Sequence, residues 1–105
     1  MPPNKAMPKR MSQAIVDIKF LERLVEKHGF KGGFFIMLTN NHCFWDGREK
    51  EGVYKYFRAK EKLNGNIEFP IFFKEIKEKC IITSNYQLCW KEIKDSEYRY
   101  LFVEV

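Results

Sequence analysis

Three short triplets pair an acidic residue with a lysine two positions later, a spacing that could support metal-dependent hydrolysis. They are Asp17-Ile18-Lys19, Glu75-Ile76-Lys77 and Glu92-Ile93-Lys94. A carboxylate in such a triplet could hold Mg²⁺ while the amine positions a water molecule. No triplet follows a Pro-Asp pair, and such triplets arise by chance in a chain with 19 basic and 14 acidic residues. We therefore expect solvated surface charges there rather than catalytic residues.

The remaining reactive side chains do not match a known type of site. His42-Cys43 has no second Cys/His pair at zinc-binding spacing. Neighbouring side chains of an extended chain point apart, so His42 is badly placed to act as a base for Cys43. The sequence also contains no glycine-rich phosphate-binding loop. We expect no catalytic residue, no metal and no cofactor.

One segment, from Trp45 to Leu63, interleaves cations with aromatic rings. This mixture can meet a phosphate backbone and stack on bases, or it can contact the loops of a partner protein. The candidate binding residues are Trp45, Arg48, Lys55, Tyr56, Arg58, Lys60 and Lys62. Acidic residues in the same stretch cancel four of its six basic charges. A solvated helix face is therefore the alternative interpretation.

The charge and cysteine content restrict the class of protein. The formal net charge is +5, but Lys5, Lys9 and Arg10 supply three of these charges, so binding to nucleic acid is permitted and not required. The three cysteines form no CxxC pair, which favours free thiols in a reducing compartment. No apolar run approaches the roughly 20 residues of a membrane span, and the first residues lack the apolar centre of a signal peptide. We expect a soluble cytoplasmic chain with no membrane contact.

The clearest element is a helix, which we expect from Ser12 to His28. Apolar residues recur there at intervals of three and four, with charged residues between them. Ser12 could cap its start, and Gly29 follows where a left-handed residue commonly ends a helix. Residues 1–11 hold three prolines and three cations, so we expect a flexible basic tail there.

Strand patterns follow the helix. The continuous apolar run Phe34–Thr39 is typical of a buried central strand. We expect a loop and then a short helix between residues 42 and 63, and a turn at Asn64-Gly65-Asn66. Further strands are expected at residues 67–74, 79–83, 86–93 and 98–105. The pattern predicts a single α+β domain over residues 12–105, with the N-terminal helix packed on a mainly antiparallel sheet of about four or five strands.

Several short motifs together carry a family resemblance. They are Gln13, Phe20–Leu24, Gly33–Asn40, Trp45, Tyr86-x-Leu88-x-Trp90 and Tyr98–Val105. This succession resembles the C-terminal half of a bacterial restriction-endonuclease-like family of the PD-(D/E)xK type. The family usually continues as Asn-Asp-Pro before an aromatic residue and Trp, whereas this chain has Asn40-Asn41-His42-Cys43-Phe44-Trp45. The metal-binding residues of that family lie on strands before the helix, and this sequence does not contain those strands.

Three hypotheses for function follow. The first is a non-catalytic cytoplasmic binding module that resembles a nuclease C-terminal half and acts on nucleic acid or on a nucleic-acid enzyme. The second is a small phage-type or mobile-element protein that inhibits a nucleic-acid-processing protein by direct contact. The third is a complete metal-dependent nuclease, for which the required carboxylates are missing from the sequence.

Overall fold

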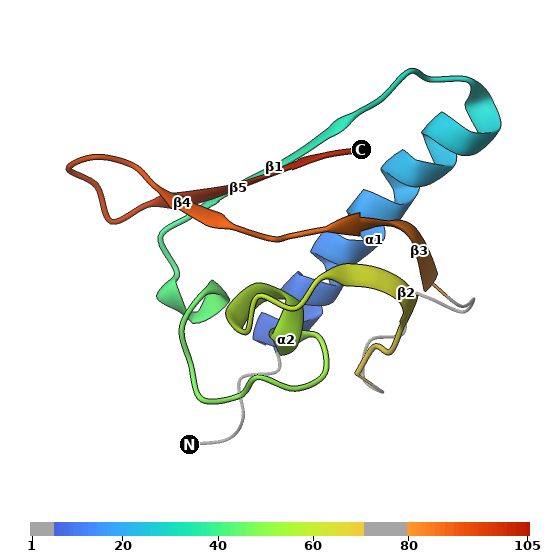
Figure 1. The fold of residues 1–105 in the computed structure, drawn as a ribbon. Coiled ribbons are helices and arrows are strands. Elements are labelled where there is room, and N and C mark those ends of the chain that lie inside the picture. The colour runs from blue at the N-terminus through green and yellow to red at the C-terminus, as the bar shows by residue number, and fades with distance from the viewer. Residues whose placement is uncertain (1–5, 71–79) are drawn as a thin grey trace.

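The computed structural model describes residues 6–70 and 80–105 (Figure 1). In chain order, its elements are α1 (Ala6–His28), β1 (Phe34–Thr39), the 3-10 turn η1 (His42–Phe44), α2 (Tyr54–Arg58), β2 (Leu63–Ile67), β3 (Cys80–Tyr86), β4 (Trp90–Glu92) and β5 (Arg99–Glu104). The described strands form a three-stranded sheet in the order β1-β5-β4 and a two-stranded sheet of β2 and β3. Every pair is antiparallel. The expected α+β class with an N-terminal helix and antiparallel strands is confirmed.

The helix α1 begins at Ala6, so the expected start at Ser12 and the expected flexible tail over residues 6–11 are wrong. Met7 and Met11 are buried and extend the apolar stripe of Ile15 towards the N-terminus. Pro8 is tolerated because it lies in the first turn, where its missing N–H has no helical partner to lose. Residues 1–5 lie outside the described part of the chain. The predicted left-handed residue at the end of the helix is confirmed, since Gly29 has a φ of 73°.

Ser12 has a role inside the helix instead of at its start. Its side chain is fully buried, and its hydroxyl donates to the carbonyl of Pro8 at 2.7 Å. This bond to the preceding turn satisfies a hydroxyl that would otherwise be buried without a partner.

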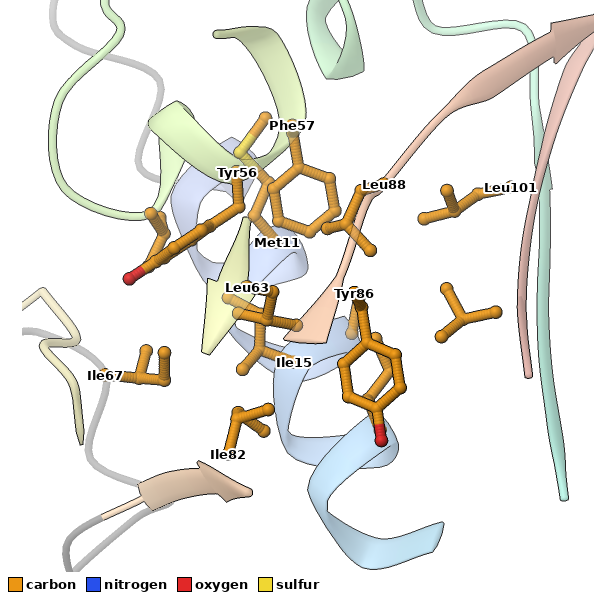
Figure 2. Packing of buried hydrophobic residues seen from close by; sticks show 14 of the residues in the cluster. Met11, Ile15, Tyr56, Phe57, Leu63, Ile67, Ile82, Tyr86, Leu88 and Leu101 are labelled. Carbon is orange, nitrogen blue, oxygen red and sulfur yellow. The ribbon is translucent and has the colours of Figure 1, made fainter. Parts of the chain in front are cut away.

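The core lies where α1, α2 and the two sheets meet (Figure 2). Met11 and Ile15 of α1 face Phe57 of α2 and Leu63 of β2, while Leu101 of β5 approaches from the other sheet. The remaining labelled members of this cluster are Tyr56, Ile67, Ile82, Tyr86 and Leu88. Burial of each large apolar side chain contributes about 1.5–3 kcal/mol, so this shared cluster is what holds the two sheets to the helix.

A buried carboxylate fixes β3 against α1. The strand β3 bulges opposite Asn64, because Leu63 pairs with Tyr86 while Gly65 pairs with Ile82. The Glu22 carboxylate, only 2% exposed, accepts hydrogen bonds from the backbone N–H groups of Thr83 and Ser84 within this bulge, at 3.0 and 3.1 Å.

Two further side chains complete the environment of Glu22. The hydroxyl of Tyr86 donates to the carboxylate at 2.7 Å, and the Lys19 ammonium lies 3.6 Å away. Burial alone would raise the pKa of Glu22, but the hydrogen bonds and the Lys19 charge outweigh it and lower the pKa below its ordinary value of 4.5. The charge is therefore buried with its partners already in place.

The strands differ from the sequence prediction in several places. The strand β1 is not central and buried, because it lies at the edge of its sheet and alternate residues are exposed. The expected turn at residues 64–66 lies inside β2, where Gly65 adopts a φ of 75° next to the bulge. The predicted strand at 67–74 is not present over Glu68–Pro70, and its residues 71–74 lie outside the described chain.

Replacing Glu22 by glutamine tests the buried carboxylate. We expect Glu22→Gln to lower the free energy of unfolding by about 1–3 kcal/mol at pH 7, because one amide cannot accept all the donors that the carboxylate serves. The folded-state pKa of Glu22 is lowered, so its contribution is present above the unfolded pKa and is lost as the pH falls through the folded value. Urea unfolding at a series of pH values should show that the difference in unfolding free energy between wild type and variant becomes smaller below about pH 4.5. A difference in unfolding free energy that does not change with pH would contradict this account.

Tyr86 gives the opposite pH dependence. Burial and the hydrogen bond to Glu22 raise the pKa of the Tyr86 hydroxyl to about 12. A raised folded-state pKa gives stability that is present below the unfolded pKa of about 10 and is lost as the pH rises towards 12. We expect the stability difference between wild type and Tyr86→Phe to shrink over that range. Loss of the most alkaline component of the tyrosinate absorbance titration in Tyr86→Phe would assign the pKa directly.

Candidate interaction surface

The predicted binding segment does not form one exposed surface. Tyr56 is buried, so the expectation that it is an exposed aromatic contact is wrong. Its ring belongs to the apolar core, since α2 is amphipathic and directs Tyr56 and Phe57 inward. Lys55 is half-buried, with its ammonium 5.3 Å from the centre of the Tyr56 ring and 3.9 Å from the Glu61 carboxylate.

Arg58 is tied to its own chain. Its Nε donates to the carbonyl of Cys43 at 2.9 Å, and its Nη1 donates to the carbonyl of Glu49, also at 2.9 Å. The guanidinium stacks 4.3 Å from the centre of the Tyr54 ring and packs over Gly47, where a Cβ atom would lie 2.6 Å from it. These contacts close the loop between η1 and α2. Arg58 is therefore a structural residue of this loop.

The other three predicted cations are exposed. Arg48, Lys60 and Lys62 all lie at the surface. Lys60 adopts a φ of 57°, and its backbone carbonyl accepts a hydrogen bond from Gln87 Nε2 at 2.6 Å. Asp46, Glu49, Glu51 and Glu61 are exposed in the same segment, so the charge of this surface is mixed.

Trp45 belongs to an aromatic cluster at the β4–β5 hairpin. Its ring lies 5.5 Å from that of Trp90, and the Arg99 guanidinium covers it at 4.6 Å. Phe44 completes the cluster, with its ring 5.5 Å from Trp90. Arg99 also forms an ion pair with Glu92 at 3.0 Å. These contacts leave Trp45 half-buried.

A polar hollow of about 360 Å³ lies next to Trp45. It is lined by Trp45 and by residues 92–99 of the β4–β5 hairpin. The hydroxyl of Ser96 in this lining accepts from the backbone N–H of Tyr98 at 3.0 Å, and Glu97 accepts from Asn40 at 3.4 Å. Within the lining, Glu92 is also paired with Arg99 at 3.0 Å.

In the described part of the chain, the acidic side chains of two acid-x-lysine triplets have partners outside their own triplet. Asp17 is exposed and accepts from Gln13 within α1 at 3.1 Å, and Glu92 is paired with Arg99. The triplet Glu75-Ile76-Lys77 lies outside the described residues. No group of three or more His, Cys, Asp or Glu side chains suited to a metal ion occurs in residues 6–70 and 80–105.

A cluster of exposed apolar side chains lies on the three-stranded sheet. Residues directly opposite in an antiparallel pair share a face, and Ile36 pairs with Phe102 while Leu38 pairs with Tyr100. We call this side the outer face, and its apolar residues are Phe34, Ile36, Leu38, Tyr100 and Phe102. Glu104, opposite Phe34, and Lys91, opposite Tyr100, lie at its two ends.

The outer face is exposed although it is built of large apolar residues. Phe34, Ile36 and Leu38 are 60–65% exposed and Phe102 is 44% exposed. The rings of Phe34 and Phe102 stack on each other with centres 5.3 Å apart. The alternate residues Leu101 and Val103 of β5 are buried on the other side of the sheet. Sequence reasoning missed the contribution of β1 to this surface, because a continuous apolar run favours a strand covered on both sides.

Comparisons with protein-family models, with curated proteins and with solved structures found no match for this chain. The resemblance to a restriction-endonuclease-like family therefore stays a prediction. None of the helices in the described parts of the chain is long and apolar enough to cross a bilayer.

The role of Arg58 can be tested against a neighbouring cation. We expect Arg58→Ala to lower the free energy of unfolding by about 1–3 kcal/mol, because two backbone carbonyls lose a charged donor. Arg48→Ala is the matched control, since Arg48 is exposed in the same segment, and its effect should stay within about 0.5 kcal/mol. Chemical denaturation of the three proteins provides the measurement. Equal stabilities for both variants would contradict the structural role of Arg58.

Proposed function

We propose that this chain is a non-catalytic binding module that holds a protein partner on its outer face. The observation that carries the proposal is the exposed cluster of Phe34, Ile36, Leu38 and Phe102. Scattered exposed apolar residues are normal, but a contiguous patch rimmed by polar residues marks an interaction site. Aromatic side chains in such a patch supply most of the binding free energy in protein interfaces.

The polar ends of the outer face define the chemistry of the partner. Glu104 lies at one end and Lys91 at the other, with only apolar side chains and Tyr100 between them. A complementary partner therefore presents an apolar centre with a basic group near Glu104 and an acidic group near Lys91. Such an arrangement fixes the orientation of the partner as well as its affinity.

Nucleic acid is the second candidate partner, favoured by the exposed cations Arg48, Lys60 and Lys62. It receives less support, because Arg58 and Lys55 are engaged within the chain and four acidic side chains share the surface. The outer face itself carries one cation, Lys91, and offers little to a phosphate backbone.

A finer form of the proposal makes the partner a nucleic-acid-processing protein, which the module would inhibit by covering its surface. The restriction-endonuclease-like resemblance is the support for this choice. A cytoplasmic location is part of the same proposal, and it is supported by the free thiols Cys43, Cys80 and Cys89.

Phe102→Ser tests the outer face. We expect that affinity purification of the tagged chain from its own cells recovers one partner protein in a stoichiometric amount. The binding of this purified partner is then measured by titration calorimetry. Phe102→Ser should weaken this binding by about 2 kcal/mol, or roughly thirtyfold, because it removes a central aromatic anchor. Phe102 is already 44% exposed, so the fold should be retained.

Two controls separate the candidate partners. Ile81→Ser alters an equally exposed apolar residue on β3, outside the outer face, and should leave binding unchanged. Lys60→Ala with Lys62→Ala should also leave it unchanged. Binding that is lost in the lysine variant and kept in Phe102→Ser, together with recovery of nuclease-sensitive material, would overturn the proposal in favour of nucleic acid.

A further inference from the structure

The free edge of β1 offers a row of unpaired backbone groups. Gly33 and Val105 exchange backbone hydrogen bonds at 3.2 and 2.9 Å, and the register continues without a break to Thr39 opposite Arg99. Hydrogen-bonded and non-hydrogen-bonded pairs alternate along an antiparallel ladder. The N–H and C=O groups of Phe34, Ile36 and Leu38 therefore point away from β5. No other described strand pairs with this edge.

This edge lacks the features with which proteins usually protect an exposed strand. The sequence of β1, Phe-Phe-Ile-Met-Leu-Thr, contains no charged residue and no proline, and its register shows no bulge. The opposite edge of the same sheet is different, because β4 is only three residues long and carries Lys91 and Glu92. An apolar and regular edge such as β1 is a template for another strand.

A groove runs beside this edge, between β1 and α1. Its volume is about 320 Å³, and its lining is formed by Arg10, Gln13, Ala14 and Asp17 of α1 and by Phe35–Met37 of β1. The groove places Ile36, the middle of the edge-facing residues, next to the helix turn that lies between Arg10 and Asp17. Both charged residues are exposed.

We infer that the β1 edge is the contact between two copies of this chain, joined antiparallel about a two-fold axis at Ile36. Phe34 of one copy then pairs with Leu38 of the other, and Ile36 pairs with Ile36. Each of these pairs can exchange two backbone hydrogen bonds, because all three residues direct their polar groups to the free edge. The inference is independent of the partner proposed for the outer face.

The charges of α1 select a second copy over an unrelated strand. Gln13 and Ala14 lie midway between Arg10 and Asp17 along α1 and line the same groove as Ile36, so the inferred two-fold axis at Ile36 would also pass close to them. The axis thus brings Arg10 of one copy towards Asp17 of the other, twice in the dimer. The same two-fold symmetry thus supplies both an antiparallel strand and the opposite charges on the helix. An unrelated extended segment would need to provide these two features independently.

Pairing would join the two three-stranded sheets into one continuous sheet. The outer faces of both copies would lie side by side on it, since the register places Phe34, Ile36 and Leu38 on that face in each copy. The dimer would therefore present two adjacent binding faces to a partner.

Sedimentation equilibrium and amide hydrogen exchange together test the edge. We expect a monomer–dimer equilibrium in the micromolar range. Exchange at high protein concentration should show added protection at the amides of Phe34, Ile36 and Leu38, and not at those of Phe35 and Met37, which already face β5. A chain that stays monomeric throughout, or a dimer without this alternating protection, would overturn the inference.

Two sets of variants make the test specific. Ile36→Pro removes an N–H group that faces the free edge and leaves the hydrogen bonds between β1 and β5 unchanged. It should weaken the dimer about thirtyfold, because the Ile36–Ile36 pair at the two-fold axis loses one hydrogen bond from each copy. Arg10→Glu alone and Asp17→Arg alone should each weaken it about tenfold, and the double exchange should restore it. Failure of the double exchange to restore dimerisation would contradict the charge pairing, even if Ile36→Pro does not fold. Phe102→Ser should leave dimerisation unchanged, so the two proposals can fail separately.

Discussion

The arrangement of α1 and β3 depends on the buried carboxylate of Glu22. A bulged strand leaves backbone N–H groups without ladder partners, and those of Thr83 and Ser84 find theirs on the helix. Burying a charge is expensive unless its partners are already in place, and Tyr86 and Lys19 supply the remaining ones. The carboxylate thus ties the two-stranded sheet to one position along α1, around which the apolar core closes.

The three-stranded sheet has one covered side and one uncovered side. Leu101 and Val103 face the core, whereas Phe34, Ile36 and Phe102 face outward with nothing from the described chain over them. The two α-helices of the described chain, α1 and α2, both contribute side chains to the core on the inner side. The high aromatic content of the chain, 17 rings in 105 residues, is therefore divided between a core and a surface. This division is the basis of the proposed binding role, and the free edge of β1 extends the same surface towards a second copy.

The basic segment shows how the same residue types serve different purposes. Arg58 satisfies two loop carbonyls and stacks on Tyr54, while Tyr56 fills the core. Trp45 packs against Trp90 beneath Arg99. What remains exposed is a mixture of both signs of charge, typical of a solvated surface. The segment positions η1 and α2, and the large apolar surface lies elsewhere.

Local patterns were sufficient for α1, its end at Gly29, and the antiparallel α+β class, because periodicity and turn chemistry act over a few residues. They did not predict the helix start at Ala6. The three prolines and three cations of residues 1–11 favoured a flexible tail, although Met7 and Met11 are buried in the core. Tertiary packing alone decided that β1 is an edge strand and that Arg58 and Tyr56 turn inward. An apolar run has the same sequence whether its own chain or another molecule covers it. Likewise, a guanidinium uses the same N–H donors for backbone carbonyls and for phosphates, so only its neighbours in the folded structure determine which acceptor it binds.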